Sequence, residues 1–176
     1  MDGPVVVYSS KYGSTQRYAE WIAEALGCPL RKAADTRIED LLAHDPIVYG
    51  GGLYASGING VSLITKNYEQ LRDKKLLVFT VGLADPAIGE QFEPILAKNF
   101  SPAMREHIRI FHLRGGIDYR RLGVLHKSMM AMLKKMVDRK PEAERTDEDR
   151  EMLETYGAVV DFTEPTSIGP LVEGAK

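Results

Sequence analysis

The residues with the clearest capacity for chemistry are Ser10-Lys11-Tyr12-Gly13-Ser14-Thr15. They follow an apolar run, Val5 to Tyr8, that is typical of a buried strand, and they lead directly into a helical pattern. The first turn of a helix offers unpaired backbone N–H groups and the positive end of the helix dipole. Glycine permits a tight turn, and the hydroxyls add donors. The segment therefore predicts a phosphate site, in which Lys11 either adds charge or is simply solvated.

The spacing of this segment separates three kinds of phosphate site. A nucleoside-triphosphate loop needs G-x-x-x-x-G-K-S/T, and no such segment occurs in the chain. A dinucleotide fingerprint needs three glycines after the first strand, whereas this loop holds only Gly13. A mononucleotide monophosphate, held by hydroxyls and backbone amides, is the option that remains. The competing interpretation is an ordinary strand-to-helix turn with a hydroxyl cap.

Apolar runs and helical periodicity alternate along the chain, which predicts an α/β fold with a parallel sheet. Strands are expected at Val5–Ser9, Pro29–Ala34, Pro46–Tyr49, Lys75–Val81 and Ile108–Leu113. Helices are expected at Ser14–Leu26, Thr36–Leu42, within Asn59–Arg72, and at Ile88–Lys98, Leu122–Val137 and Asp147–Tyr156.

The strand compositions also predict the order of the sheet. The first, third and fourth strands are the most uniformly apolar and should be central, because parallel strands buried on both faces lose polar alternation. A three-layer, doubly wound sheet of five parallel strands in the order 2-1-3-4-5 meets this requirement. Its switch point lies between strands one and three, so residues 10–15 and 51–60 should flank a ligand crevice and residues 82–87 should close it.

Composition sets the remaining bounds. The 176 residues predict one domain, spanning residues 1–176, and the net charge of −2 gives no attraction to nucleic acid. Cys28 is the only cysteine and is assigned a structural role. No segment reads as a membrane span or a secretion signal, so a cytoplasmic location is expected. The four histidines show no metal-ligand spacing, and no metal site or catalytic residue is assigned.

The first loop resembles the FMN phosphate loop of flavodoxins, whose pattern is roughly Ser/Thr-x-Thr-Gly-x-Thr. Ser10, Gly13 and Thr15 match it, and Tyr12 replaces the central threonine. The resemblance implies a flavodoxin-like fold with noncovalent FMN and a redox function. Tyr54 then either contacts the flavin ring or covers the sheet edge. The cofactor-binding residues expected on this basis are Ser10, Lys11, Tyr12, Gly13, Ser14, Thr15, Leu53, Tyr54, Ala55, Gly82, Leu83 and Ala84.

A narrower resemblance is to the flavodoxin-like, quinone-dependent protoporphyrinogen oxidases of haem synthesis. It lies in residues 45–57, in residues 113–119, in the basic residue at Lys11 and in the Tyr119-Arg120-Arg121 entry to a long basic helix. This resemblance implies oxidation of protoporphyrinogen IX with a quinone as acceptor. The alternatives are a flavodoxin that carries electrons to a protein partner and a flavin-free interaction module. A phosphoacceptor receiver is disfavoured, because Ser9-Ser10 stands where such domains carry acidic residues.

The expected helix at residues 122–137 combines an apolar stripe with basic surroundings. The stripe consists of Leu125, Met129, Met132, Leu133 and Met136. One interpretation packs this stripe on the sheet and leaves a solvated basic face. The other brings Arg120, Arg121 and Lys127 to an anionic substrate or to the inner face of a membrane.

Overall fold

A parallel sheet forms the centre of the computed structural model, which describes residues 2–176. Its strands lie in the order β2-β1-β3-β5-β6, and all four pairings on this path are parallel. This confirms the predicted order 2-1-3-4-5, because β4 is a short addition that pairs antiparallel with β3. The strands are β1 Val5–Ser9, β2 Leu30–Lys32, β3 Ile47–Tyr54, β4 Gly57–Ile58, β5 Leu76–Gly82 and β6 Arg109–Arg114.

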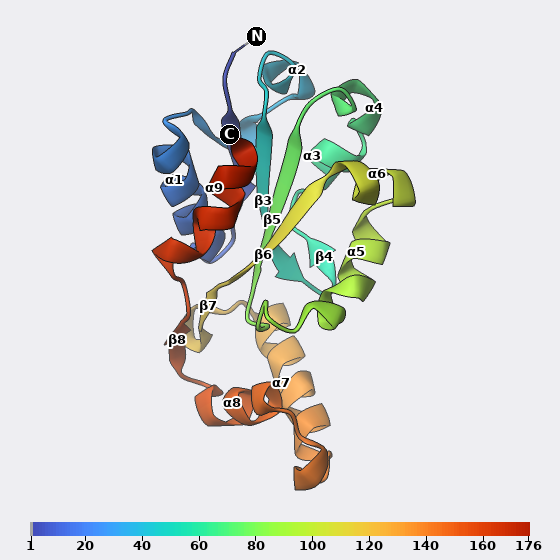
Figure 1. Cartoon of the computed structure of the whole chain (residues 1–176). Helices are drawn as coiled ribbons and strands as arrows, with labels where there is room; N and C mark the ends of the chain where they lie inside the picture. Colours follow the sequence, from blue (N-terminus) through green and yellow to red (C-terminus); the bar gives the residue numbers. More distant parts are fainter. Residues whose placement is uncertain (1) are drawn as a thin grey trace.

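Helices cover both faces of the sheet and complete a three-layer doubly wound fold (Figure 1). On one face Tyr18 and Ile22 of α1 pack with Leu171 of α9 against alternate residues of β1, β3 and β5. The other face is covered by the remaining short helices. The helices on the sheet are α1 Ser14–Leu26, α2 Ile38–Leu41, α3 Ser62–Thr65, α4 Tyr68–Leu71, α5 Glu93–Asn99, α6 Pro102–His107 and α9 Gly169–Ala175.

The glycine run 50–52 belongs to β3, whereas the sequence predicted that the strand ends at Tyr49. A Cβ atom on Gly50 would lie 2.0 Å from a ring carbon of Phe79, and one on Gly51 would lie 2.7 Å from the carbonyl oxygen of Asn59. These glycines therefore allow close packing inside the sheet and do not form a loop. The chain turns at Ala55 and Ser56, whose φ angles are 48° and 64°, and returns as β4.

Other element boundaries also differ from the sequence predictions. The helix expected within residues 59–72 is divided into α3 and α4, and residues 89–92 form a 3-10 turn before α5. Helix α6 was not predicted. Each of these helices is shorter than eight residues, so its periodic signal covers too few turns to locate its ends.

A long excursion separates β6 from the last helix of the sheet. The antiparallel strands β7 Gly116–Asp118 and β8 Val159–Asp161 lead out and back, and between them lie α7 Val124–Asp138 and α8 Asp147–Thr155. Figure 1 shows this α7–α8 hairpin (residues 124–155) beyond the carboxyl ends of the strands.

The expectation that residues 122–137 pack on the sheet is wrong. Helix α9 takes that place through Leu171 and Ala175, which are buried in the core with α1. Helix α7 lies outside the sheet with much of its apolar stripe exposed. Among residues 2–176 no helix is both long enough and apolar enough to cross a bilayer.

Candidate functional site

The first loop places a helix N-terminus at the carboxyl edge of the sheet. Gly13 caps α1 with φ of 103°, a conformation that disfavours other residues, and its N–H donates to Ser10 Oγ at 3.1 Å. The first hydrogen bond of the helix runs from the Arg17 N–H to the Gly13 carbonyl at 3.0 Å. The preceding N–H groups of Ser14, Thr15 and Gln16 donate no hydrogen bond within residues 2–176.

The hydroxyls of this loop are fixed by neighbouring strands. Ser14 Oγ accepts the N–H of Gly116 in β7 at 3.2 Å, and Ser10 Oγ accepts from Gly13. Thr15 is buried against β3, where a Cβ on Gly52 would lie 3.3 Å from its Oγ1. A hydroxyl that accepts one bond still has its own proton to donate. The predicted residues Ser10, Gly13, Ser14 and Thr15 therefore surround one helix terminus.

An aromatic cluster joins the first two predicted loops to α7. The Tyr12 hydroxyl is hydrogen-bonded to His126 Nδ1, and the rings of Tyr54 and His126 meet edge to face at 4.3 Å. Lys11 is exposed, with its Nζ 5.8 Å from the centre of the Tyr12 ring. Burial, assisted by the charge of Lys11, lowers the pKa of His126 and favours the neutral imidazole. The sequence pattern does not place His126 at this site, because its partners Tyr12 and Tyr54 are more than 70 residues away.

The second and third predicted loops are packed against each other. Leu53 covers Gly82, where an added Cβ would lie 3.0 Å from Leu53 Cδ1. The Ala55 carbonyl accepts Lys98 Nζ at 2.9 Å. Two predicted residues, Leu53 and Gly82, thus lie side by side, and a third, Tyr54, lies beside His126.

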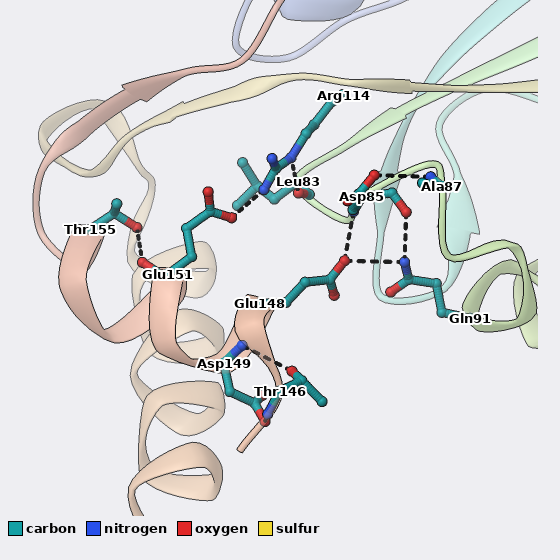
Figure 2. A network of polar contacts seen from close by, with 10 residues as sticks. All are labelled: Leu83, Asp85, Ala87, Gln91, Arg114, Thr146, Glu148, Asp149, Glu151 and Thr155. Carbon is teal, nitrogen blue, oxygen red and sulfur yellow. Dashed lines mark hydrogen bonds and ion pairs between the residues drawn. The ribbon is translucent and has the colours of Figure 1, made fainter. Parts of the chain in front are cut away.

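Helix α8 binds the third loop through two carboxylates (Figure 2). Glu148 Oε1 accepts the Asp85 N–H at 2.7 Å and Gln91 Nε2 at 3.2 Å. Arg114 donates to the Leu83 carbonyl at 2.9 Å and also forms an ion pair with Glu151. The third loop, predicted to close a ligand crevice, is therefore held by the α7–α8 hairpin.

A small cavity of about 150 Å³ lies between the first loop and the β7–β8 ribbon. Arg17 and Arg121 line it together with Asp118 and Asp161. Arg17 pairs with Asp161 at 2.7 Å and Asp118 pairs with Arg120 at 3.0 Å, so within the described chain Arg121 is the lining cation without an ion pair. The cavity is smaller than the pockets that enclose drug-sized ligands. A larger one, about 330 Å³, lies at the α5–α6 corner and holds none of the predicted site residues.

Comparison with known proteins establishes the family. The profile of the Flavodoxin domain matches residues 5–144. The chain belongs to the flavodoxin family. The matched residues include the first loop, both neighbouring loops and α7. A search of curated proteins finds no match.

Solved structures similar to this flavodoxin domain include two flavodoxins. One, from the domain Archaea, is 18% identical, with a TM-score of 0.44, and covers 64% of this chain and 83% of its own. The other, oxidised flavodoxin 2 of Bacillus cereus, is 20% identical, with a TM-score of 0.44 and coverages of 64% and 84%. The Trp repressor binding protein of Bacillus subtilis is 18% identical, with a TM-score of 0.43 and coverages of 65% and 83%.

Family membership agrees with FMN, and the residues at α1 fit its phosphate. Three N–H groups and the hydroxyls of Ser10 and Thr15 gather at one helix terminus, and the first turn of α1 contains no acidic residue that would repel a dianion. The residues predicted to contact the flavin ring are less open than those at the phosphate end. Leu53 packs on Gly82, and the His126 ring contacts Tyr54. Among the described residues no group of histidine, cysteine and carboxylate side chains could hold a metal ion.

Proposed function

We propose that this flavodoxin domain binds FMN at the N-terminus of α1 and acts as a flavin-dependent oxidoreductase. The observation that carries the proposal is the set of N–H groups of Ser14, Thr15 and Gln16, which lack recorded partners at the positive end of a 13-residue helix. Such a terminus stabilises a phosphate dianion without a dedicated cation.

The residues around the terminus have distinct tasks in this proposal. The hydroxyls of Ser10 and Thr15 orient the phosphate, and the isoalloxazine supplies the redox chemistry when FMN is bound. Tyr54 offers an aromatic face to a flat ring. The His126 ring contacts Tyr54 in the structure, so binding of a flavin ring at Tyr54 requires α7 to move there.

We further propose a reduced tetrapyrrole, protoporphyrinogen IX, as electron donor and a quinone as acceptor. The support is the resemblance in residues 45–57 and 113–119, together with cations near the first loop. Arg120 is engaged in a two-point ion pair with Asp118, which lowers the pKa of that carboxyl. The propionates are therefore assigned to Arg121 and Lys127, both exposed and without ion pairs within residues 2–176.

The first experiment tests the cofactor. The protein is purified without added flavin, its visible spectrum is recorded, and FMN is titrated by quenching of flavin fluorescence. We expect FMN to bind, and S10A/T15A to weaken binding about a hundredfold, since each hydroxyl bonds a charged group. The variant S62A/T65A, which removes two hydroxyls of α3, is the control and should bind normally. A colourless protein that does not bind added FMN would refute FMN as the cofactor and would favour the function of a flavin-free interaction module.

The second experiment tests the substrate. The flavin-loaded protein is mixed anaerobically with protoporphyrinogen IX and a soluble quinone, and porphyrin fluorescence is followed. We expect oxidation that R121E/K127E slows and that K32E/K66E, which removes two exposed lysines elsewhere, leaves unchanged. If R121E/K127E oxidises the substrate at the normal rate, the assigned residues are wrong. If the FMN-loaded protein oxidises no protoporphyrinogen, the alternative function of carrying electrons to a protein partner is favoured.

A further inference from the structure

Exposed apolar surface in this protein is concentrated on one helix. Eight large hydrophobic side chains are exposed in the described chain, and five of them lie on α7, so this exposure is a continuous feature and not scatter. Leu125 and Met132 are each 65% exposed, Met136 58% and Leu133 45%. Together with the partly buried Met129 they form the α7 stripe, in which neighbours are three, four or seven residues apart.

The side of α7 next to the stripe is already covered. Val137 is buried, and the Nζ of Lys134 lies 5.8 Å from the centre of the Tyr156 ring, just after α8. Lys140 forms an ion pair with Asp149 of α8 at 2.9 Å. Helix α8, which lies beside α7 in Figure 1, therefore covers the side of α7 that carries Lys134. The α7 stripe remains exposed.

Cations flank the α7 stripe. Lys135 follows Met132 by three residues, and Arg139 follows Met136 by three, so both lie beside the stripe on the helix surface. Both are exposed and without an ion pair among residues 2–176. Lys134, by contrast, is paired with Asp138 at 2.7 Å. An apolar stripe bordered by unpaired cations is the surface pattern of a helix that lies in a membrane interface.

We propose that the α7 stripe docks on an anionic lipid surface, with Lys135 and Arg139 over the headgroups. Charge complementarity selects this occupant over a second copy of the chain. The one acidic side chain of α7, Asp138, already pairs with Lys134, so two stripes facing each other would offer no unpaired carboxylate of α7 to Lys135. A leaflet that contains phosphatidylglycerol supplies both the apolar medium and the negative charge.

Docking would also position the proposed redox site. Helix α7 reaches the first loop through His126, which contacts Tyr12 and Tyr54. The α7 stripe begins at Leu125, the adjacent residue. A membrane beneath α7 would therefore lie beside the proposed flavin site. The docking itself requires no flavin, so its test is independent of the proposed function.

The test is sedimentation of the full chain with vesicles of equal parts phosphatidylglycerol and phosphatidylcholine, against vesicles of phosphatidylcholine alone. We expect binding to the anionic vesicles that added salt weakens. M132S/M136S should lower the partition coefficient about tenfold or more, because two apolar side chains no longer enter the interface. K135Q/R139Q should lower it about thirtyfold, since each basic residue near the surface contributes about fivefold.

Matched controls keep the result specific. L42S/I88S removes two exposed apolar side chains elsewhere, and K32Q/K66Q removes two exposed cations elsewhere; both should bind like the original protein. Circular dichroism checks that each variant is folded. S10A/T15A, which should lose FMN, should still bind vesicles, so a failed cofactor and a failed docking surface are distinguishable.

Three results would overturn the proposal. They are no binding to anionic vesicles, equal binding by the α7 variants and the original chain, and a dimer in analytical ultracentrifugation that M132S/M136S dissociates. The last would assign the α7 stripe to a second copy of the chain.

Discussion

Gly13 and Gly50 are required for different structural reasons. Gly13 has φ of 103° and open space around it, so its value lies in backbone conformation. Gly50 has no positive φ, and its value is the missing Cβ, whose place the Phe79 ring fills. The same residue type thus forms a loop at one position and permits tight sheet packing at the other.

Gly50→Ala should destabilise the fold. The added methyl would lie 2.0 Å from a Phe79 ring carbon in a core with no room for the ring to retreat, since Phe79 is fully buried. We expect the free energy of unfolding in urea to fall by about 1 to 3 kcal/mol, the usual cost of overpacking. Gly89→Ala, where nothing lies within 4 Å, is the control and should stay near the original value. Equal stability of the two variants would contradict this packing.

His126→Ala should strengthen FMN binding. The imidazole covers Tyr54 and bonds the Tyr12 hydroxyl, so the free protein gives up those contacts when a ring reaches Tyr54. Removing them should lower the Kd for FMN several-fold, which corresponds to the net free energy of about one hydrogen bond. Quenching of flavin fluorescence measures this Kd. Ser128→Ala, an exposed change on the same helix, is the control. Weaker binding by His126→Ala would mean that the imidazole contacts the flavin.

Lowering the pH should weaken the contact of His126 with Tyr12 and Tyr54. The pKa of His126 is lowered by burial and then by Lys11, so the packed conformation favours neutral imidazole. The contribution of this contact is complete above the ordinary histidine pKa of about 6.5 and is lost as the pH falls below it. The original protein should therefore gain FMN affinity relative to His126→Ala between about pH 7.5 and 5.5. A constant ratio of the two Kd values would exclude this linkage.

At the scale of elements, the β7–β8 ribbon is fastened to α1 at its returning strand. Asp161 bonds Arg17 at 2.7 Å and the Thr163 hydroxyl at 2.7 Å. Tyr18 then donates its hydroxyl to the Arg114 carbonyl and accepts the Glu164 N–H. These contacts direct the chain from the α7–α8 hairpin back to the sheet, where α9 completes the core.

Asp161→Asn should loosen this fastening. Hydrogen bonds from Thr163, and then the charge of Arg17, lower the pKa of Asp161 to about 2. A lowered carboxyl pKa adds stability above its ordinary value of about 3.9, and this stability disappears as the pH falls towards about 2. Because the side chain is half exposed, solvent screening limits the loss at neutral pH to about 1 kcal/mol.

The measurement for Asp161 is urea unfolding at neutral and at acid pH. The difference between the original protein and Asp161→Asn should shrink as the carboxyl is protonated. Glu173→Gln, which removes an exposed ion pair with Lys176, serves as the control. An unchanged difference down to about pH 2 would show that the carboxyl charge is irrelevant there.

At the scale of the whole molecule, a flavodoxin sheet carries a helical excursion at its ligand-facing edge. Side chains attach the α7–α8 hairpin at three places: His126 on the first two loops, Glu148 on the third loop and Glu151 on Arg114. Helix α8 has no buried residue and contributes no side chain to the core of the sheet. The α7–α8 hairpin therefore lies beside the proposed flavin site and contributes no side chain to either core cluster of the sheet.

Excision of residues 119–158 should leave a folded core. Asp118 and Val159 are directly paired in the antiparallel ribbon, so an Asn-Gly turn can join them. We expect cooperative thermal unfolding by circular dichroism, FMN binding at least as tight as in the full chain, and no binding to anionic vesicles. A chain that unfolds without cooperativity would show that the α7–α8 hairpin supports the sheet. Equal vesicle binding would remove the α7 stripe from the docking proposal.

Local composition was sufficient to predict the order of the sheet and the position of the first loop. Continuous apolar runs such as Val5–Tyr8 can only be buried on both faces, which makes them central and fixes the strand order. The carboxyl ends of β1, β3 and β5 then share one edge, so the loops at Ser10, Tyr54 and Gly82 lie along it. These features follow from local composition and from the geometry of parallel strands.

Which helix covers the sheet, and which side chains contact the first loops, became clear from the three-dimensional packing. Periodicity shows that α7 has an apolar face, but it does not name the surface that receives it, and α9, with Gly169, Pro170 and Gly174, has a weak signal yet fills the core. The glycines of β3 read as a loop until Phe79 is placed against them. His126 meets Tyr12 across more than a hundred residues. Long-range packing chooses among surfaces that local patterns leave equivalent.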